Sequence, residues 1–372
     1  MRPTKYLHNV NARRWFASGV LALGIVLSGC TEKPPEDTFI HRALNDYILP
    51  LQGNMAERSK HLAELVTEQC RGLEGSEAGE QTLDLESLQA AWRLSMRAWE
   101  QLQAINYGPI NTKNLAWKFQ FWPDSKNLLA RKIRPLLSSE QSLTPEQFNK
   151  ASTVVQGLSA IEYLLFDPSL NTQRVSSNRM CDLLSLQSDQ LQRHSASLLQ
   201  DWQGRYGKQL NRYGPENVDF PDAKTVVAHI VDGQLSLLES ASNKKLADAL
   251  GSKRKKARVN PYLLESWRSQ NSRQNLQANL ASVDLLFHRA GLKRYLEKSG
   301  AEPLAKEIEL ALQKAQEHLR ADHRSFFQSL QAGNIDNAEA SQQALSELAG
   351  LYKHPLPKAL GIQLGFNNND GD

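Results

Sequence analysis

The chain has 372 residues, enough for two domains, and 40% of them are hydrophobic. Its 44 Lys and Arg residues exceed its 40 Asp and Glu residues by four, and the four surplus charges all lie in the first 29 positions, at Arg2, Lys5, Arg13 and Arg14. The rest of the chain is formally neutral, which excludes the broad basic surface of a nucleic-acid-binding protein, and we expect no nucleic-acid partner.

The first 29 residues have the pattern of a lipoprotein signal peptide. Their apolar stretch, residues 15–27, is too short to span a bilayer. It ends in the lipobox Leu27-Ser28-Gly29-Cys30, which predicts a lipid on Cys30 that attaches the chain to the membrane. The alternative is an ordinary signal peptide followed by a chance cysteine. Thr31 in place of aspartate favours the periplasm-facing outer membrane of a bacterial cell envelope, and residues 30–37 are the predicted tether.

The remaining sequence predicts helices throughout, because apolar residues recur at helical spacing and no useful stretch alternates with period two. The predicted helices cover residues 38–70 with a kink at Pro50, then 83–105, 126–137, 144–167, 178–206, 223–250, 272–287, 303–330 and 338–352. Residues 211–222 contain two Gly/Pro punctuation points and form the predicted linker. We therefore expect an all-α fold of two helical bundles, residues 38–210 and 211–372.

Two cysteines, Cys70 and Cys181, follow the lipobox. In an oxidising periplasm an even pair favours a disulfide, which here would close a long loop. The alternative is two free thiols, because spacing alone does not decide between them.

The most apolar segment after the signal peptide is Gly157–Phe166, and it carries one carboxylate, Glu162. A helix that is apolar nearly all round is buried on several sides, and Ser159 and Glu162 lie one turn apart on one face of it. A buried glutamate must be paired, hydrogen-bonded, metal-bound or protonated. Two interpretations stay open: Glu162 pairs with an arginine inside a bundle, or it belongs to a ligand site.

Other chemistry-bearing patterns are weaker. An aromatic-rich stretch around Trp117 and Trp122 lines a pocket or plugs the space between helices. His229 and Asp232 share a helix face, as surface residues or as metal ligands. The sequence has no zinc-binding His-Glu-x-x-His helix, no Gly-rich phosphate loop and no Gly-x-Ser-x-Gly elbow.

Several motifs in a fixed order resemble the imelysin-like family. They are the lipobox, Tyr107-Gly108-Pro109-Ile110, Phe121-Trp122-Pro123-Asp124, Gly157-x-Ser159-x-x-Glu162, Ser269-x-x-Ser272 and the tail from Gly365 to Asp372. The resemblance implies an all-α protein of two four-helix-type bundles related by a degenerate duplication. It also implies an envelope protein of a kind often linked to iron acquisition. Some members were classed as metallopeptidases because of a Gly-x-His-x-x-Glu motif.

The chain departs from that motif at Ser159, where the family has histidine. A hydroxyl is a poor metal ligand beside imidazole, so the His/Glu metal site does not carry over. The chain is similar to the lipoprotein branch of the family that lacks this histidine.

The expected function is therefore a non-enzymatic, lipid-anchored protein that binds a ligand, or a metal ion such as iron or another divalent cation, between the bundles. The resemblance links it to iron or heme acquisition and to membrane proteins of iron uptake. The expected binding residues are Gly157, Ser159, Glu162, Trp122, Asp124, Ser269, Ser272 and Asp370. The alternatives are a metal-dependent peptidase of the imelysin type and a scaffold for a partner membrane protein.

Overall fold

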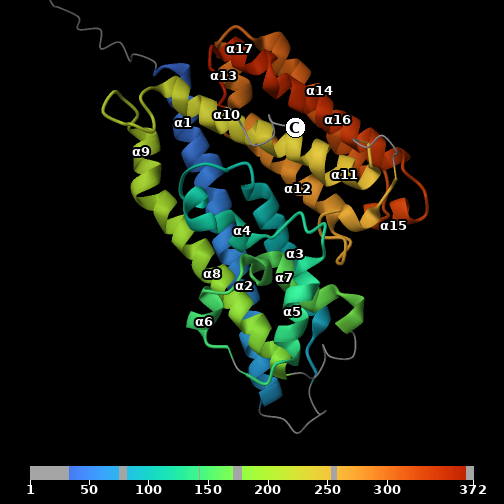
Figure 1. The fold of residues 1–372 in the computed structure, drawn as a ribbon. Coiled ribbons are helices and arrows are strands. Elements are labelled where there is room, and N and C mark those ends of the chain that lie inside the picture. The colour runs from blue at the N-terminus through green and yellow to red at the C-terminus, as the bar shows by residue number, and fades with distance from the viewer. Residues whose placement is uncertain (1–32, 75–81, 142, 171–177, 253–257, 366–372) are drawn as a thin grey trace, which may run out of the picture. The chain divides into compact units, whose positions relative to one another are not determined.

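Helices make up the fold of the computed structural model, which describes residues 33–74, 82–141, 143–170, 178–252 and 258–365 (Figure 1). These ranges contain no strand, so the predicted all-α class is confirmed. The described residues from Pro34 onward form one compact unit.

The first half of the chain is organised around four helices, α2, α3, α7 and α8, that pack against one another. α2 (blue in Figure 1) and α8 (yellow-green) run side by side. α3 shows how the sequence produces this packing, since Leu88, Trp92 and Met96 recur every four residues and are all buried. The elements of this half are α1 (Pro35–Arg42), the π-helical η1 (Ala43–Ile48), α2 (Leu49–Glu74), α3 (Leu85–Leu102), η2 (Gly108–Asn114), α4 (Leu115–Phe119), α5 (Leu128–Ser138), α6 (Pro145–Asn149), η3 (Thr153–Val155), α7 (Gly157–Phe166), η4 (Pro168–Leu170), α8 (Asn178–Asp201), the π-helical η5 (Trp202–Tyr206) and α9 (Gly207–Asn211).

The second half has a corresponding group, in which α10, α12, α14 and α16 pack together. Its elements are α10 (Ala223–Ser240), the π-helical η6 (Ala241–Leu246), α11 (Ala247–Leu250), η7 (Pro261–Leu263), α12 (Ser272–Asp284), the π-helical η8 (Leu285–Arg289), α13 (Leu292–Lys298), α14 (Glu302–Arg320), α15 (Phe326–Gln331), α16 (Asp336–Lys353) and α17 (Pro355–Leu360). The halves meet where α3 packs on α12 and where α1 packs on α10 and α13. The division between residues 210 and 211, and the duplication of the bundles, stay predictions.

Two long predicted helices are wrong because they are interrupted. The capping box of Thr144 and Gln147 is confirmed, but its helix α6 ends at Asn149 and α7 begins only at Gly157. The helix predicted for residues 303–330 is divided into α14 and α15 by a second capping box, which Ser325 and Gln328 form. The irregularity predicted at Pro50 is present as η1, which ends two residues earlier. Because proline has no N–H, the helix cannot keep regular hydrogen bonds there.

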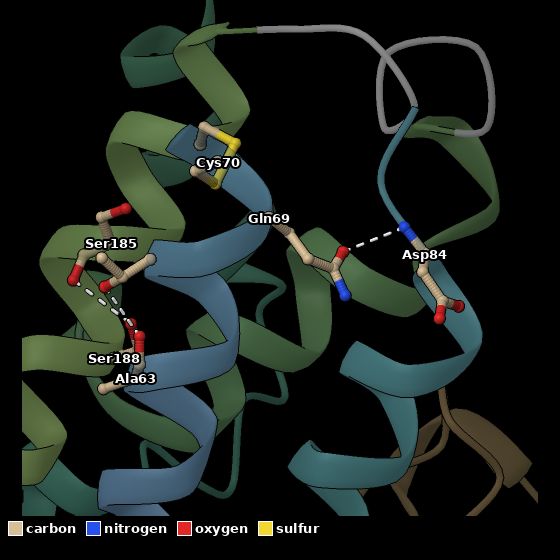
Figure 2. Close-up of a disulfide and its surroundings, with 8 residues drawn as sticks. Ala63, Gln69, Cys70, Asp84, Ser185 and Ser188 are labelled. Atoms are coloured by element: carbon tan, nitrogen blue, oxygen red, sulfur yellow. Dashed lines mark hydrogen bonds between the residues drawn. A yellow bond between two sulfur atoms is a disulfide. The ribbon is translucent and has the colours of Figure 1, made fainter. Parts of the chain in front are cut away.

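The predicted disulfide between Cys70 and Cys181 is confirmed. It joins α2 to α8, with the two Cα atoms 5.5 Å apart (Figure 2). Nearby, the Gln69 side chain on α2 accepts a 2.9 Å hydrogen bond from the backbone N–H of Asp84, which caps α3. In the chain-entropy model a bridge across a loop of this length stabilises the fold by about 4–5 kcal/mol.

The N-terminal predictions fall mostly outside the described residues, which include neither the signal peptide nor Cys30 and Thr31. The predicted tether, residues 30–37, stays a prediction; its last three residues belong to α1, which begins at Pro35 with proline at its first position. Within the described ranges, no helix combines the length and the apolar character needed to cross a membrane.

Candidate functional site

Helix α7 is placed by its first residue, Gly157. Its φ is +71°, and a Cβ at this position would lie 2.3 Å from the carbonyl oxygen of Lys118 and 2.4 Å from that of Phe119. Only glycine fits this left-handed turn pressed against the end of α4. Gly157 therefore sets where α7 starts; it does not line the pocket described below.

Glu162 is buried in the middle of α7, with 5% of its surface exposed. Its Oε1 accepts hydrogen bonds from the backbone N–H of Ser269, at 2.9 Å, and from the Ser269 hydroxyl, at 2.8 Å. Burial raises the pKa of the Glu162 carboxyl, and the two Ser269 hydrogen bonds oppose that rise. Oε2 accepts no hydrogen bond within the described part of the chain. Oε1 is thus held by Ser269, and Oε2 has no hydrogen-bond partner among the described residues.

Of the two interpretations of Glu162, pairing with an arginine finds no ion pair among the described residues. Arg268 forms its ion pair with Asp167 at 2.8 Å, and its guanidinium stacks over the Tyr163 ring. Arg268 still acts on Glu162 through space, since its charge lowers the pKa of that carboxyl. The positive charge is therefore near the site but already neutralised.

A small pocket of about 40 Å³ adjoins Glu162. One side comes from the first half of the chain and includes the predicted residues Trp122, Asp124, Ser159 and Glu162; the other side comes from residues 262–268 and includes Tyr262, Ser266, Trp267 and Arg268. Sequence reasoning did not single out this second side. It carries no motif of its own, and only the tertiary fold brings it within reach of α7.

Two of the predicted residues, Asp124 and Ser272, bond to the backbone. Both carboxylate oxygens of Asp124 accept N–H groups at the start of α5, from Leu128 at 2.7 Å and Leu129 at 3.0 Å. Ser272 begins α12, and its hydroxyl donates to the carbonyl of Glu265. Asp370 lies outside the described residues. Asp124 and Ser272 therefore have structural partners that compete with any ligand.

Some residues of the aromatic-rich stretch line the pocket, and others pack between helices. Trp122 and Phe121 line the pocket. Phe119 is instead a packing residue, fully buried and stacked on Trp99 with ring centroids 4.8 Å apart. Trp117 is 45% exposed and lines neither the pocket nor the core.

The segment that forms the second side of the pocket, residues 262–268, also contributes Glu265 to a buried cluster of two carboxyl groups and one lysine, which the sequence analysis missed. Lys245 of η6 lies between two glutamates. Its ammonium donates a hydrogen bond to Oε2 of Glu100 on α3, and its Nζ lies 2.8 Å from Oε2 of Glu265. All three side chains are almost completely buried. The signal was present in the sequence, because Glu100 continues the apolar stripe of Trp92 and Met96 at four-residue spacing.

Neutral amides complete this buried network. Gln103 donates to Glu100 Oε1 at 3.0 Å and Asn279 to Glu100 Oε2 at 2.7 Å. Gln120 and Asn275 donate to the two oxygens of Glu265, each at 2.9 Å. Every carboxylate oxygen of the network is therefore occupied, as a buried ionic cluster requires.

The backbone between the two sites is strained. Ser266 and Gln270 adopt φ values of +50° and +57°, which non-glycine residues rarely do. Such positions cost about 1–3 kcal/mol each and concentrate at functional sites. Here they let one short segment present Glu265 to Lys245 and Ser269 to Glu162.

The donor set does not fit a catalytic zinc centre. Such a centre takes three protein ligands, typically imidazoles and carboxylates, and keeps one open position. The pocket offers one carboxylate with an unoccupied oxygen, and Ser159 contributes only a hydroxyl. No group of three His, Cys, Asp or Glu side chains suited to a metal occurs among the residues the structure describes.

The comparisons with known proteins match imelysin-like proteins and proteins called iron-regulated protein A. The family model for imelysin, a peptidase family, matches residues 75–352. Iron-regulated protein A of Synechococcus elongatus is 25% identical over 202 residues, which cover 53% of this chain and only half of that protein's length. The crystal structure of an imelysin-like protein from Psychrobacter arcticum superposes with a TM-score of 0.75 at 20% identity, covering 89% of this chain and 97% of the other. An iron-regulated protein A precursor from Parabacteroides distasonis gives 0.69 at 17% identity, covering 90% and 97%.

Proposed function

Because the chain belongs to the imelysin family, we propose that it is a lipid-anchored envelope protein that binds a small hydrated cation, iron first, beside Glu162. It acts as a binding protein in iron acquisition and does not hydrolyse peptides. The observation that carries this proposal is the Glu162 carboxylate, buried in a pocket with one oxygen held by Ser269 and the other without a protein partner.

The charge of the pocket favours a cation. Its lining holds two carboxylates, Asp124 and Glu162, against one guanidinium, Arg268, and that guanidinium is already paired with Asp167. Glu162 lines this pocket and Oε2 has no partner among the described residues, so a cation or its bound water can contact that oxygen. Ser159 and Ser266 add neutral oxygens suited to the waters of a hydrated ion.

The size of the pocket limits the ligand. A water molecule needs roughly 10–15 Å³ of such space, so about 40 Å³ holds an ion with two or three waters. A heme or a peptide side chain with its backbone does not fit. This favours ionic iron over heme as the cargo.

The peptidase alternative lacks support in the donor set. Metal-assisted hydrolysis needs an ion held firmly enough to lower the pKa of a bound water. With Ser159 in the place of histidine and Asp124 engaged in capping α5, Glu162 alone does not provide that hold.

The cellular setting rests on the sequence and on the names of relatives. Two similar proteins are called iron-regulated protein A, one of them a precursor. The N-terminal lipobox supports export and lipidation at Cys30. We expect the partners to be membrane proteins of iron uptake, reached from the outer membrane.

Titration calorimetry of the mature protein with Fe²⁺ under anaerobic conditions, and with Mn²⁺, tests the proposal. Saturable binding is expected, and Glu162→Gln should weaken it about tenfold or more, because it removes the charge that contacts the ligand. The matched control is Glu307→Gln, the same change on an exposed position of α14, which should leave binding intact. Equal binding by wild type and Glu162→Gln would refute the site, and chelator-sensitive peptidase activity would refute the non-enzymatic assignment.

A further inference from the structure

Five aromatic side chains form a closed circuit of ring contacts that shares no residue with the Glu162 pocket. Consecutive ring centroids lie 4.9–6.0 Å apart in the order Tyr107, Trp202, Tyr206, Phe220, His229 and back to Tyr107. The rings come from both halves of the chain, since Trp202 and Tyr206 belong to η5 and His229 to α10. The contacts are edge-to-face or tilted, as aromatic pairs prefer.

A cavity of about 420 Å³ opens on this circuit. Tyr107, Tyr206, Phe220 and His229 line it, and the exposed residues Asp201, Arg205 and Asp219 stand at its rim. Its volume lies within the range of small-molecule sites, about 300–1,000 Å³. It is about ten times larger than the pocket beside Glu162.

The backbone is adapted to seat one of these rings. Gly108 has a φ of +74°, and a Cβ there would lie 2.5 Å from Cε1 of Tyr206. η5 is itself kinked at Gly204, between Trp202 and Tyr206. The Tyr107-Gly108-Pro109-Ile110 motif therefore has a local role, which is to supply one ring and to make room for another.

The charges around the cavity are predominantly negative. Asp201 and Asp219 face a single guanidinium, Arg205, which forms no ion pair within the described chain. Desolvation lowers the pKa of His229, and the charge of Asp219 opposes that fall. Burial raises the pKa of Tyr206, and the charge of Asp219 adds to that rise.

One polar group at the cavity lacks a partner. Tyr107 is buried, and its hydroxyl has no hydrogen bond within the described residues. A buried hydroxyl left unpaired costs about 1–3 kcal/mol.

We propose that this cavity is a second binding site, for a small organic cation such as a quaternary or protonated amine. The cation sits against the ring of Tyr206, whose face carries negative charge density, and Asp201 and Asp219 attract it. The two carboxylates repel an anion, and they attract a cation by a charge interaction that a neutral ligand does not have. The site goes beyond the proposed iron function and does not depend on it.

The test compares choline with a neutral alcohol of the same shape and adds tetramethylammonium as a second cation. Calorimetry on the mature protein uses choline, tetramethylammonium and the neutral alcohol in which carbon replaces the nitrogen of choline. Choline should bind about 2- to 30-fold more tightly than the alcohol, the range expected for a cation–π contact. Equal affinities for choline and the alcohol, or no saturable binding of either cation, overturn the proposal.

Variants locate the binding. Tyr206→Leu and Asp219→Asn should each weaken choline binding about 2- to 30-fold, whereas Tyr206→Phe keeps the ring and should retain it. Gly108→Ala should also weaken binding, because its methyl group displaces Tyr206. Glu162→Gln alters only the other pocket and should leave choline binding unchanged, so failure of the iron site does not decide this test. Binding by Tyr206→Leu equal to that of Tyr206→Phe contradicts the assignment.

Discussion

Two buried glutamates, Glu100 on α3 and Glu162 on α7, differ in how their carboxylate oxygens are occupied. Glu100 is fully buried, and both of its oxygens accept hydrogen bonds, one of them from the ammonium of Lys245. Glu162 is nearly as buried, but among the described residues it has only Ser269 on one oxygen and no ion-pair partner. A closed set of partners is typical of a structural role, and the open oxygen of Glu162 is the one that we propose contacts a ligand.

The largest expected effect tests the closed cluster. Lys245→Met removes the ammonium that contacts both buried carboxyl groups, Glu100 and Glu265, and should lower the free energy of unfolding by about 3–5 kcal/mol. Lys314→Met, which breaks a solvent-exposed pair with Glu347, is the matched control and should cost about 0–1 kcal/mol. Urea unfolding measures both. Equal losses would mean that the cluster is not the structural centre described here.

A second effect concerns pH. Burial and the charge of Glu265 raise the pKa of Glu100 to about 8. A carboxyl with a raised pKa binds its proton more tightly in the folded chain. Its stabilising contribution is therefore complete below the ordinary pKa and is lost as pH rises through about 8.

The free energy of unfolding of the wild type should accordingly fall relative to that of Glu100→Gln by a few kcal/mol between about pH 5 and about pH 9. Unfolding curves at several pH values provide the measurement, with Glu307→Gln as the variant that should follow the wild type. A constant difference across this range would show that Glu100 stays ionised throughout.

The smallest effect is expected at the open site. Ser269→Ala removes the hydroxyl from Glu162 but keeps the backbone N–H, and it should cost about 1.5–3 kcal/mol, the value for a hydrogen bond to a charged group. Ser195→Ala removes a buried hydroxyl that bonds only within its own helix and should change stability little. If both changes cost the same, the Ser269 contact carries no special weight.

The sequence predicted the burial of Glu162 because the segment around it is apolar on nearly every side. It did not predict the partner from periodicity, since Ser269 lies 107 positions away and only the family resemblance pointed to it. The break before α15 was missed because Phe326, Phe327 and Leu330 continue the apolar spacing of α14, although Ser325 and Gln328 held a capping signal. Local patterns thus predicted most helices, whereas contacts between the halves required the fold.

The roles of Asp124 and Ser272 also could not be predicted from local sequence patterns. Both are small polar residues in family-like motifs, and the sequence cannot tell a side chain that faces a ligand from one that caps a helix or bonds a nearby carbonyl. The structure gives each of them a backbone partner. Ser159 and Trp122 line the pocket with Glu162, and Asp124 lines it as well while its oxygens accept the N–H groups of α5.

The most direct measurement is anomalous diffraction from crystals of the protein soaked in Mn²⁺. The account predicts a peak in the pocket bounded by Ser159, Glu162 and Arg268, absent in Glu162→Gln crystals treated in the same way. A pocket without a peak, or a peak at Glu100 and Glu265, would contradict the claim that Glu162 is the carboxylate left open for a ligand.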